Sequence, residues 1–112
     1  MNARREAWLW TIQRASAAVL ALCVLVHLAT IIFAVRGGLT AAEILGRTRG
    51  SAAWAAFYGA FVVAVALHAP IGLRAVLAEW FGWRGSSMEV AMVLFALLLA
   101  VLGARAILGV VS

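Results

Sequence analysis

Two histidines, His27 and His68, lie inside long apolar stretches of this 112-residue chain, and they are its clearest candidates for chemistry. Imidazole titrates near neutral pH, and its neutral form is a common metal ligand in proteins. Ionisable groups within apolar segments are rare and usually functional. A histidine between helices can instead form only an interhelical hydrogen bond, worth ~0.6 kcal/mol on average in membrane proteins. Both hypotheses stand for each histidine.

The composition indicates a membrane setting. Hydrophobic residues make up 67% of the chain and charged residues 12%, whereas a soluble domain is nearer half apolar and a quarter charged. The net charge of +5 comes from arginines that flank apolar runs, so lipid headgroups explain it better than nucleic acid does. The single cysteine, Cys23, excludes an internal disulfide and is expected to be a packing residue.

Charged residues divide the chain into three apolar runs that are long enough to cross a bilayer, which takes about 20 residues. The third run reaches this length only if Arg105 extends its guanidinium to the interface. Open sheets are excluded because their edges leave backbone groups unsatisfied in lipid. We therefore predict an all-α membrane protein with three transmembrane helices, one domain over residues 1–112, that forms part of a larger helical bundle. The predicted helices span roughly 12–36, 51–79 and 87–110.

The connections carry helix-start signals. Thr40 followed by Glu43 is a capping-box pattern and predicts a short interfacial helix at about 40–46. Either Ser86 or Ser87 is expected to cap the third transmembrane helix.

The arginines predict the orientation. With three spans, the N-terminus and the loop at 74–89 lie on the same side of the membrane. That side carries five arginines and the other carries four, which places the N-terminus in the cytoplasm of a bacterial-type inner membrane. The five are Arg4, Arg5, Arg14, Arg74 and Arg84, and the four are Arg36, Arg47, Arg49 and Arg105.

An axial bond to haem iron is the chemistry that suits the two histidines best. A proton path would use Asp or Glu, which the uncharged runs lack, and zinc takes several N or S ligands. Neutral imidazole is a haem ligand in apolar, water-poor sites. Ala60, Ala64 and Gly72 lie at four-residue steps around His68, so a porphyrin or a neighbouring helix can approach the backbone there.

The depths of the histidines imply a second set of helices. His27 lies ~18 Å into the first span and His68 ~9 Å from the same surface, a difference of roughly 9 Å. Two axial nitrogens on one iron are only ~4 Å apart. One chain is therefore not expected to hold one haem between its own histidines. Either each histidine serves a different haem, or only one is a ligand. The opposing ligands would come from a second membrane subunit or a second copy of this chain.

The stretches "RAS" at 14–16 and "LHAPIGLRAVLAEW" at 67–80 resemble the cytochrome b membrane-anchor subunits of succinate dehydrogenase and fumarate reductase, respiratory complex II. The match covers about residues 13–80. The family shows a histidine, then a glycine four residues later, then x-Arg, and an acidic residue after a further turn. His68, Gly72, Arg74 and Glu79 match this pattern. Departures are Ala17 for a glycine, Ala75 for a histidine and Glu79 for an aspartate.

The resemblance implies specific roles. His68 would be a haem b ligand, and His27 the ligand found in two-haem members. Arg14 and Ser16 would line the quinone pocket beside the iron–sulfur subunit. Arg74 would contact a haem propionate, although Arg14 and Arg74 can equally be arginines that extend to the interface.

The resemblance also implies partners. The chain would dock a flavoprotein and an iron–sulfur subunit and pass electrons to quinone, with one or two haems b shared with a partner. It has no nucleotide-binding glycine motif and no cysteine set for clusters, so it contains no succinate-oxidising site. The alternatives are another di-haem cytochrome b, such as a hydrogenase subunit, and a non-redox assembly or transport subunit whose histidines only pack.

Overall fold

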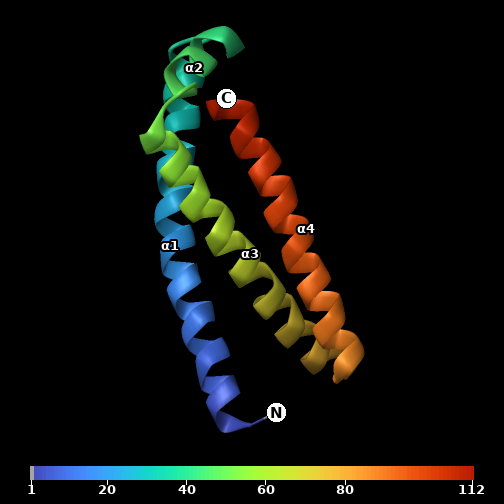
Figure 1. Cartoon of the computed structure of the whole chain (residues 1–112). Coiled ribbons are helices and arrows are strands. Elements are labelled where there is room, and N and C mark those ends of the chain that lie inside the picture. The colour runs from blue at the N-terminus through green and yellow to red at the C-terminus, as the bar shows by residue number, and fades with distance from the viewer. Residues whose placement is uncertain (1) are drawn as a thin grey trace.

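The computed structural model describes residues 2–112, which form four helices and no strands. Three of these helices are long and apolar enough to cross a membrane, which confirms the predicted all-α membrane fold. The fourth, α2, lies across one end of the elongated bundle (Figure 1). The helices are α1 (Ala3–Arg36), α2 (Ala41–Thr48), α3 (Ala52–Phe81) and α4 (Ser86–Val111).

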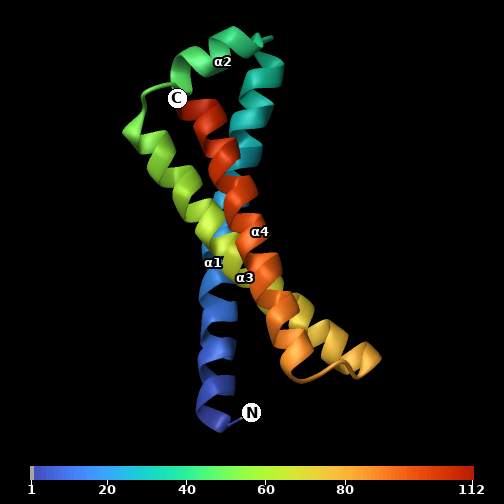
Figure 2. The same cartoon turned by 45° about the vertical axis from the view of Figure 1, so that its right-hand side comes forward.

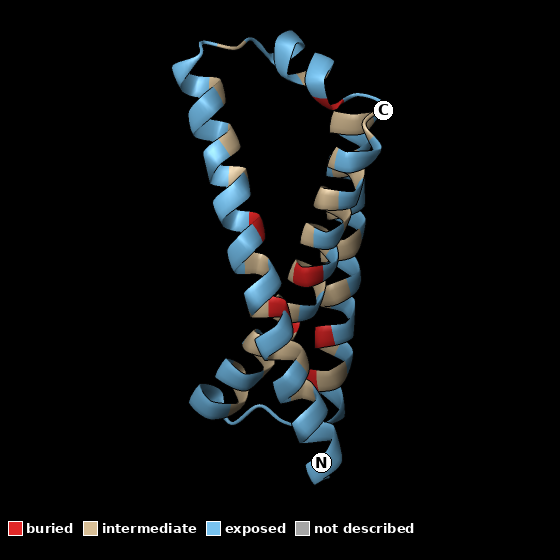
Figure 3. Cartoon of the chain, turned by 90° about the vertical axis from the view of Figure 1, so that its left-hand side faces the viewer, coloured by how far each residue is buried: buried red, intermediate tan, exposed pale blue. Residues whose placement is uncertain are grey.

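Helix α3 is the central element, because it packs against both α1 and α4, while α1 and α4 have little contact with each other. Figure 2 shows α3 and α4 crossing each other on one side of α1. Helix α1 crosses α3 in the half of the bundle that holds the N-terminus and diverges from α3 and α4 toward α2 (Figure 3). Side chains can therefore meet between α1 and α3 near the crossing, and a wider space opens beyond it.

The bundle has almost no conventional core. In the most apolar windows of α1, α3 and α4, only 6%, 11% and 0% of the residues are buried. Most of the helical surface is exposed, as the pale blue ribbon in Figure 3 shows, and many of the exposed side chains are large and hydrophobic. In water this surface would be strongly unfavourable, at about 25 cal/mol per Å². Lipid or further helices must cover it.

The first helix begins earlier than the sequence indicated. We expected the span to start at residue 12, but α1 already starts at Ala3, because the Asn2 side chain accepts a hydrogen bond from the backbone N–H of Arg5 at 2.8 Å. The 34 residues of α1 are ~51 Å long, well beyond the ~30 Å of a hydrocarbon core. The charged residues of its first turns, Arg4, Arg5 and Glu6, would lie outside that core.

The helix start predicted by the capping-box pattern is confirmed, with Thr40 as the N-cap. Its hydroxyl oxygen accepts from the backbone N–H of Glu43 at 3.2 Å and donates to the Glu43 carboxylate at 3.1 Å. Helix α2 continues to Thr48, two residues beyond the expected end, because the Thr48 hydroxyl donates to the carbonyl of Val110 at 2.5 Å. This bond ties the end of α2 to the end of α4.

The predicted serine cap of α4 is wrong. The N-cap is Gly85, which has a φ of 98° and makes no side-chain capping bond. Ser86 is the first helical residue, and the Ser87 hydroxyl instead accepts from the indole N–H of Trp83 at 2.8 Å. A positive φ at the turn favours glycine at residue 85, and the Ser87 hydroxyl is bonded to the Trp83 indole instead of to a backbone N–H of the helix.

Candidate functional site

Each histidine contacts a hydroxyl group on the neighbouring helix, and the two pairs are arranged reciprocally. His68 on α3 has its Nδ1 3.3 Å from Oγ of Ser16 on α1. His27 on α1 has its Nδ1 3.4 Å from Oη of Tyr58 on α3. Helices α1 and α3 are antiparallel, so the two pairs form separate levels along the same helix–helix contact.

The two levels are further apart than the sequence suggested. Ser16 and His27 are 11 residues apart on α1, and Tyr58 and His68 are 10 residues apart on α3, so the levels are separated by ~15 Å. The sequence-based difference of ~9 Å was too small, because it assumed that Ala15 and Arg74 lie at one membrane surface. The structure pairs Ser16 with His68 and Arg74 with Glu6, so Arg74 lies nearer the N-terminal end than Ala15. The larger separation strengthens the conclusion that the two histidines of one chain cannot bind one iron.

Three of the predicted site residues share one groove. Arg14 on α1 and His68 and Arg74 on α3 line an open cavity of about 480 Å³ between these helices. The guanidinium carbon of Arg14 lies 5.1 Å from the centre of the Trp10 ring. Ser16 does not line this groove. It is buried behind it, with 5% of its surface exposed, against the His68 ring.

Gly72 lies where a side chain of α1 packs against the backbone of α3. A Cβ at this position would lie 3.0 Å from Nε2 of Gln13, so the glycine allows the α1 side chain to approach the α3 backbone. At this position the small residue accommodates a neighbouring helix. Oε1 of Gln13 is buried and has no hydrogen-bond partner within residues 2–112.

Arg74 joins a cluster of charges at the N-terminal end of the bundle. Its Nε donates to the Glu89 carboxylate of α4 at 3.0 Å, and its terminal nitrogen lies 3.8 Å from Glu6 of α1. Arg5 also donates to Glu89, at 2.5 Å. Glu6 and Arg74 line both the His68 groove and a neighbouring polar cavity of about 710 Å³, which Glu79 also lines. The cluster therefore connects three helices and borders the groove.

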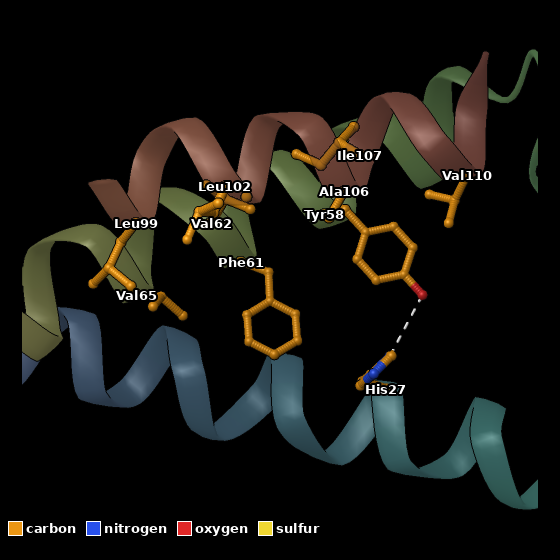
Figure 4. Close-up of a pocket in the computed structure, with 11 residues that line it drawn as sticks. His27, Tyr58, Phe61, Val62, Val65, Leu99, Leu102, Ala106, Ile107 and Val110 are labelled. Carbon is orange, nitrogen blue, oxygen red and sulfur yellow. Dashed lines mark hydrogen bonds between the residues drawn. The ribbon is translucent and has the colours of Figure 1, made fainter. Parts of the chain in front are cut away.

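His27 faces a different cavity, of about 510 Å³, in the space where α1 diverges from α3 and α4 (Figure 4). Its ring makes edge contacts with Tyr58 and Phe61, with ring centres 5.9 and 5.8 Å apart. The other walls are aliphatic side chains and a glycine of α3 and α4. His27 therefore shares no cavity with Arg14, His68 and Arg74. Cys23, a turn earlier, is buried and free.

The histidines suit a haem better than a metal ion held by the chain alone. No group of three or more His, Cys, Asp or Glu side chains in residues 2–112 is arranged to hold a metal ion. Each imidazole has Nδ1 paired to a hydroxyl and lines a cavity with its ring. Haem iron takes one protein ligand on a given face, and a histidine nitrogen is a common one, so a single imidazole per site is compatible with haem ligation.

Sequence reasoning missed several residues that the structure places at these sites. Gln13 is one helical turn before Ser16, which was a usable signal for a shared face. Tyr58 is the only tyrosine of the chain, and nothing in its spacing linked it to His27 on another helix. Glu89 pairs with Arg74, and this pairing depends on how α3 and α4 pack.

Comparison with known proteins agrees with the earlier resemblance. Searches of curated proteins and of solved structures found no match to this chain. The family model described as succinate dehydrogenase/fumarate reductase transmembrane subunit matches residues 1–104, nearly the whole chain. This protein belongs to the family of succinate dehydrogenase/fumarate reductase transmembrane subunits.

Proposed function

We propose that this chain is the haem b-binding membrane-anchor subunit of a succinate:quinone oxidoreductase. In this role it docks a flavoprotein and an iron–sulfur subunit at its N-terminal end and supports electron transfer to quinone. The observation that carries the proposal is the groove that joins Arg14, His68 and Arg74 in a member of this family. Succinate oxidation would take place in the soluble subunits.

His68 and His27 are the proposed axial ligands, each on its own level of the bundle. A bound haem b would supply a one-electron carrier within the membrane. The chain's part is to hold one imidazole at each level, with mainly apolar walls around His27 and a groove of mixed apolar and charged walls around His68. The second ligand at each level would come from another membrane subunit or a second copy of this chain, because the two levels are ~15 Å apart.

Arg14 is the proposed quinone-binding donor. Its guanidinium is exposed at the groove, and stacking over Trp10 restricts its orientation. Quinone carbonyl oxygens accept hydrogen bonds, and arginine keeps its donors charged at any physiological pH. Leu9 and Ile71 supply apolar walls for the ring. The resemblance also assigns Ser16 to this pocket. Because Ser16 is buried against the His68 ring, a quinone could contact it only if side chains of the groove rearranged.

The N-terminal end is the proposed docking end, on the cytoplasmic side. Here α1 projects past the bilayer, and the arginines of the charge cluster lie beside the groove. Quinone reduction consumes two electrons and two protons. A groove at this end would be near the iron–sulfur subunit, which delivers the electrons, and near water, which delivers the protons.

The test is the visible absorption spectrum of the purified, assembled complex. We expect a low-spin haem b signal in the wild type and its loss at one site in His68→Ala. Thr11→Ala, which removes an exposed hydroxyl bonded to the carbonyl of Ala7, is the matched control on α1 and should leave the spectrum unchanged. An unchanged spectrum in a His68→Ala complex that still contains the flavoprotein and iron–sulfur subunits would refute the ligand assignment.

A further inference from the structure

The hydroxyl of Ser16 lies within hydrogen-bond distance of two polar groups, the carbonyl of Gln13 and Nδ1 of His68. Ser16 donates its proton to the backbone carbonyl of Gln13, with Oγ 3.1 Å from that oxygen. A serine hydroxyl has one proton and two lone pairs. While it makes this bond, Ser16 acts as an acceptor toward Nδ1 of His68, 3.3 Å away. In this arrangement Nδ1 carries the imidazole proton.

This arrangement selects one tautomer of His68. A neutral imidazole with its proton on Nδ1 has its lone pair on Nε2, the nitrogen that remains available to a metal. Histidine ligands usually donate their second N–H to such an acceptor, which fixes the ring and increases the basicity of the ligating nitrogen. We propose that Ser16 is the positioning residue that holds His68 in its Nε2-ligating tautomer. This inference rests on the proposed function, and it differs from the quinone contact that family resemblance implies.

Burial makes the contact effective. Ser16 has 5% of its surface exposed, so water does not compete for its oxygen. In an environment of low dielectric constant, a hydrogen bond is electrostatically stronger than it is in water. The small serine also allows the α3 imidazole to approach α1 closely. The bond thus crosses the helix–helix contact and links the orientation of the ring to the backbone of α1 at Gln13.

The His27 level provides an internal comparison. Oη of Tyr58 lies 3.4 Å from Nδ1 of His27, and within residues 2–112 it has no other hydrogen-bond acceptor. Its proton is therefore not committed elsewhere, and this pair leaves the tautomer of His27 open. The two pairs look alike but differ in this respect, so the inference applies to His68 alone.

The proposal predicts a change in redox potential. A hydrogen bond from Nδ1–H to an acceptor increases electron density on the ligating nitrogen and stabilises ferric iron. Removing the acceptor should raise the midpoint potential of the haem at the His68 level. If Ser16 only filled space, loss of its hydroxyl would leave the midpoint potential of this haem unchanged.

The experiment compares Ser16→Thr with Ser16→Val in the assembled complex. The two side chains have nearly the same shape, so any disturbance caused by the added methyl group is shared. Threonine can also donate to a backbone carbonyl within its own helix, which keeps a lone pair for His68. The measurements are redox titration of the haem and its low-spin spectrum. Thr11→Val, on the same helix and away from the histidines, is the control.

We expect Ser16→Thr to retain the wild-type potential and Ser16→Val to raise it, with the control unchanged. Equal potentials in the threonine and valine variants, with haem present in both, would overturn the role of Ser16 and leave the proposed function intact. The role is also overturned if valine raises only the KM for quinone. A wild-type complex without haem overturns the haem assignment itself.

Discussion

Nε of Arg74 on α3 lies 3.0 Å from the Glu89 carboxylate on α4, at the boundary between the histidine groove and the polar end of the bundle. Glu89 also accepts from Arg5 of α1, so one carboxylate connects all three long helices. The Arg74 and Glu89 side chains are 20% and 33% exposed. Such a pair is less screened than a surface ion pair, whose contribution is usually below about 1 kcal/mol.

Replacing Arg74 by Leu should destabilise the assembled complex by about 1–3 kcal/mol, because it leaves Glu89 with less compensation in a partly buried position. Thermal unfolding in detergent or lipid nanodiscs measures the effect. Arg105→Leu is a suitable control, since within residues 2–112 Arg105 forms no ion pair. Equal losses of stability in the two variants would mean that the cluster has no special role.

The sequence predicted the number of spans and the capping box at Thr40 well, because hydropathy and local capping depend on residues close together in the chain. It did not predict the beginning of α1 at Ala3, which depends on a cap at Asn2 within a polar segment. The failed serine cap of α4 has a similar origin, since a glycine turn and a tryptophan decide it.

For the site, the sequence identified individual residues but not their relationships. Arg14, His68 and Arg74 come from two separate motifs and lie in one groove, whereas Ser16 contacts the histidine ring directly and lies outside the groove. The partners of His27 and Arg74 are Tyr58 and Glu89, on other helices. Such pairs depend on helix rotation and crossing, which periodicity within a single helix does not determine.

Gly103 should be essential for the crossing of α3 and α4. A Cβ at this position would lie 2.5 Å from Cγ1 of Val62, closer than side-chain atoms can pack. We expect Gly103→Ala to destabilise the protein by about 1–3 kcal/mol, as overpacking typically does. Adding Val62→Ala should recover much of this loss, because it removes the methyl groups that clash. A double mutant as unstable as Gly103→Ala would contradict this packing.

Arg14 should affect quinone chemistry without affecting assembly. Arg14→Leu removes the exposed guanidinium over Trp10 and should slow quinone reduction about tenfold or more, equivalent to ~1.4 kcal/mol or more of transition-state stabilisation. Succinate oxidation with a soluble artificial acceptor should be unchanged, since that reaction does not use the groove. Arg14→Lys should fall between, because it keeps the charge but loses the planar donors. Equal loss of both activities would indicate an assembly defect.

Replacing His68 and replacing His27 should each remove a different haem from the complex. Because the levels are ~15 Å apart, both histidines can be axial ligands only if each binds its own iron, with the opposing ligand from another membrane subunit or a second copy of the chain. The two-haem arrangement therefore predicts two haems b per pair of bundles, with His68→Ala removing the one nearer the N-terminal end and His27→Ala removing the other. Pyridine haemochrome analysis of the purified complexes gives the stoichiometry, and a redox titration assigns each loss to one potential.

Tyr58→Phe is the matched variant for the level of His27, since it removes the hydroxyl and keeps the ring that packs on His27. A complex whose entire haem content disappears with His68→Ala and is unchanged in His27→Ala would reduce His27 to a packing residue, bonded to Tyr58 across α1 and α3.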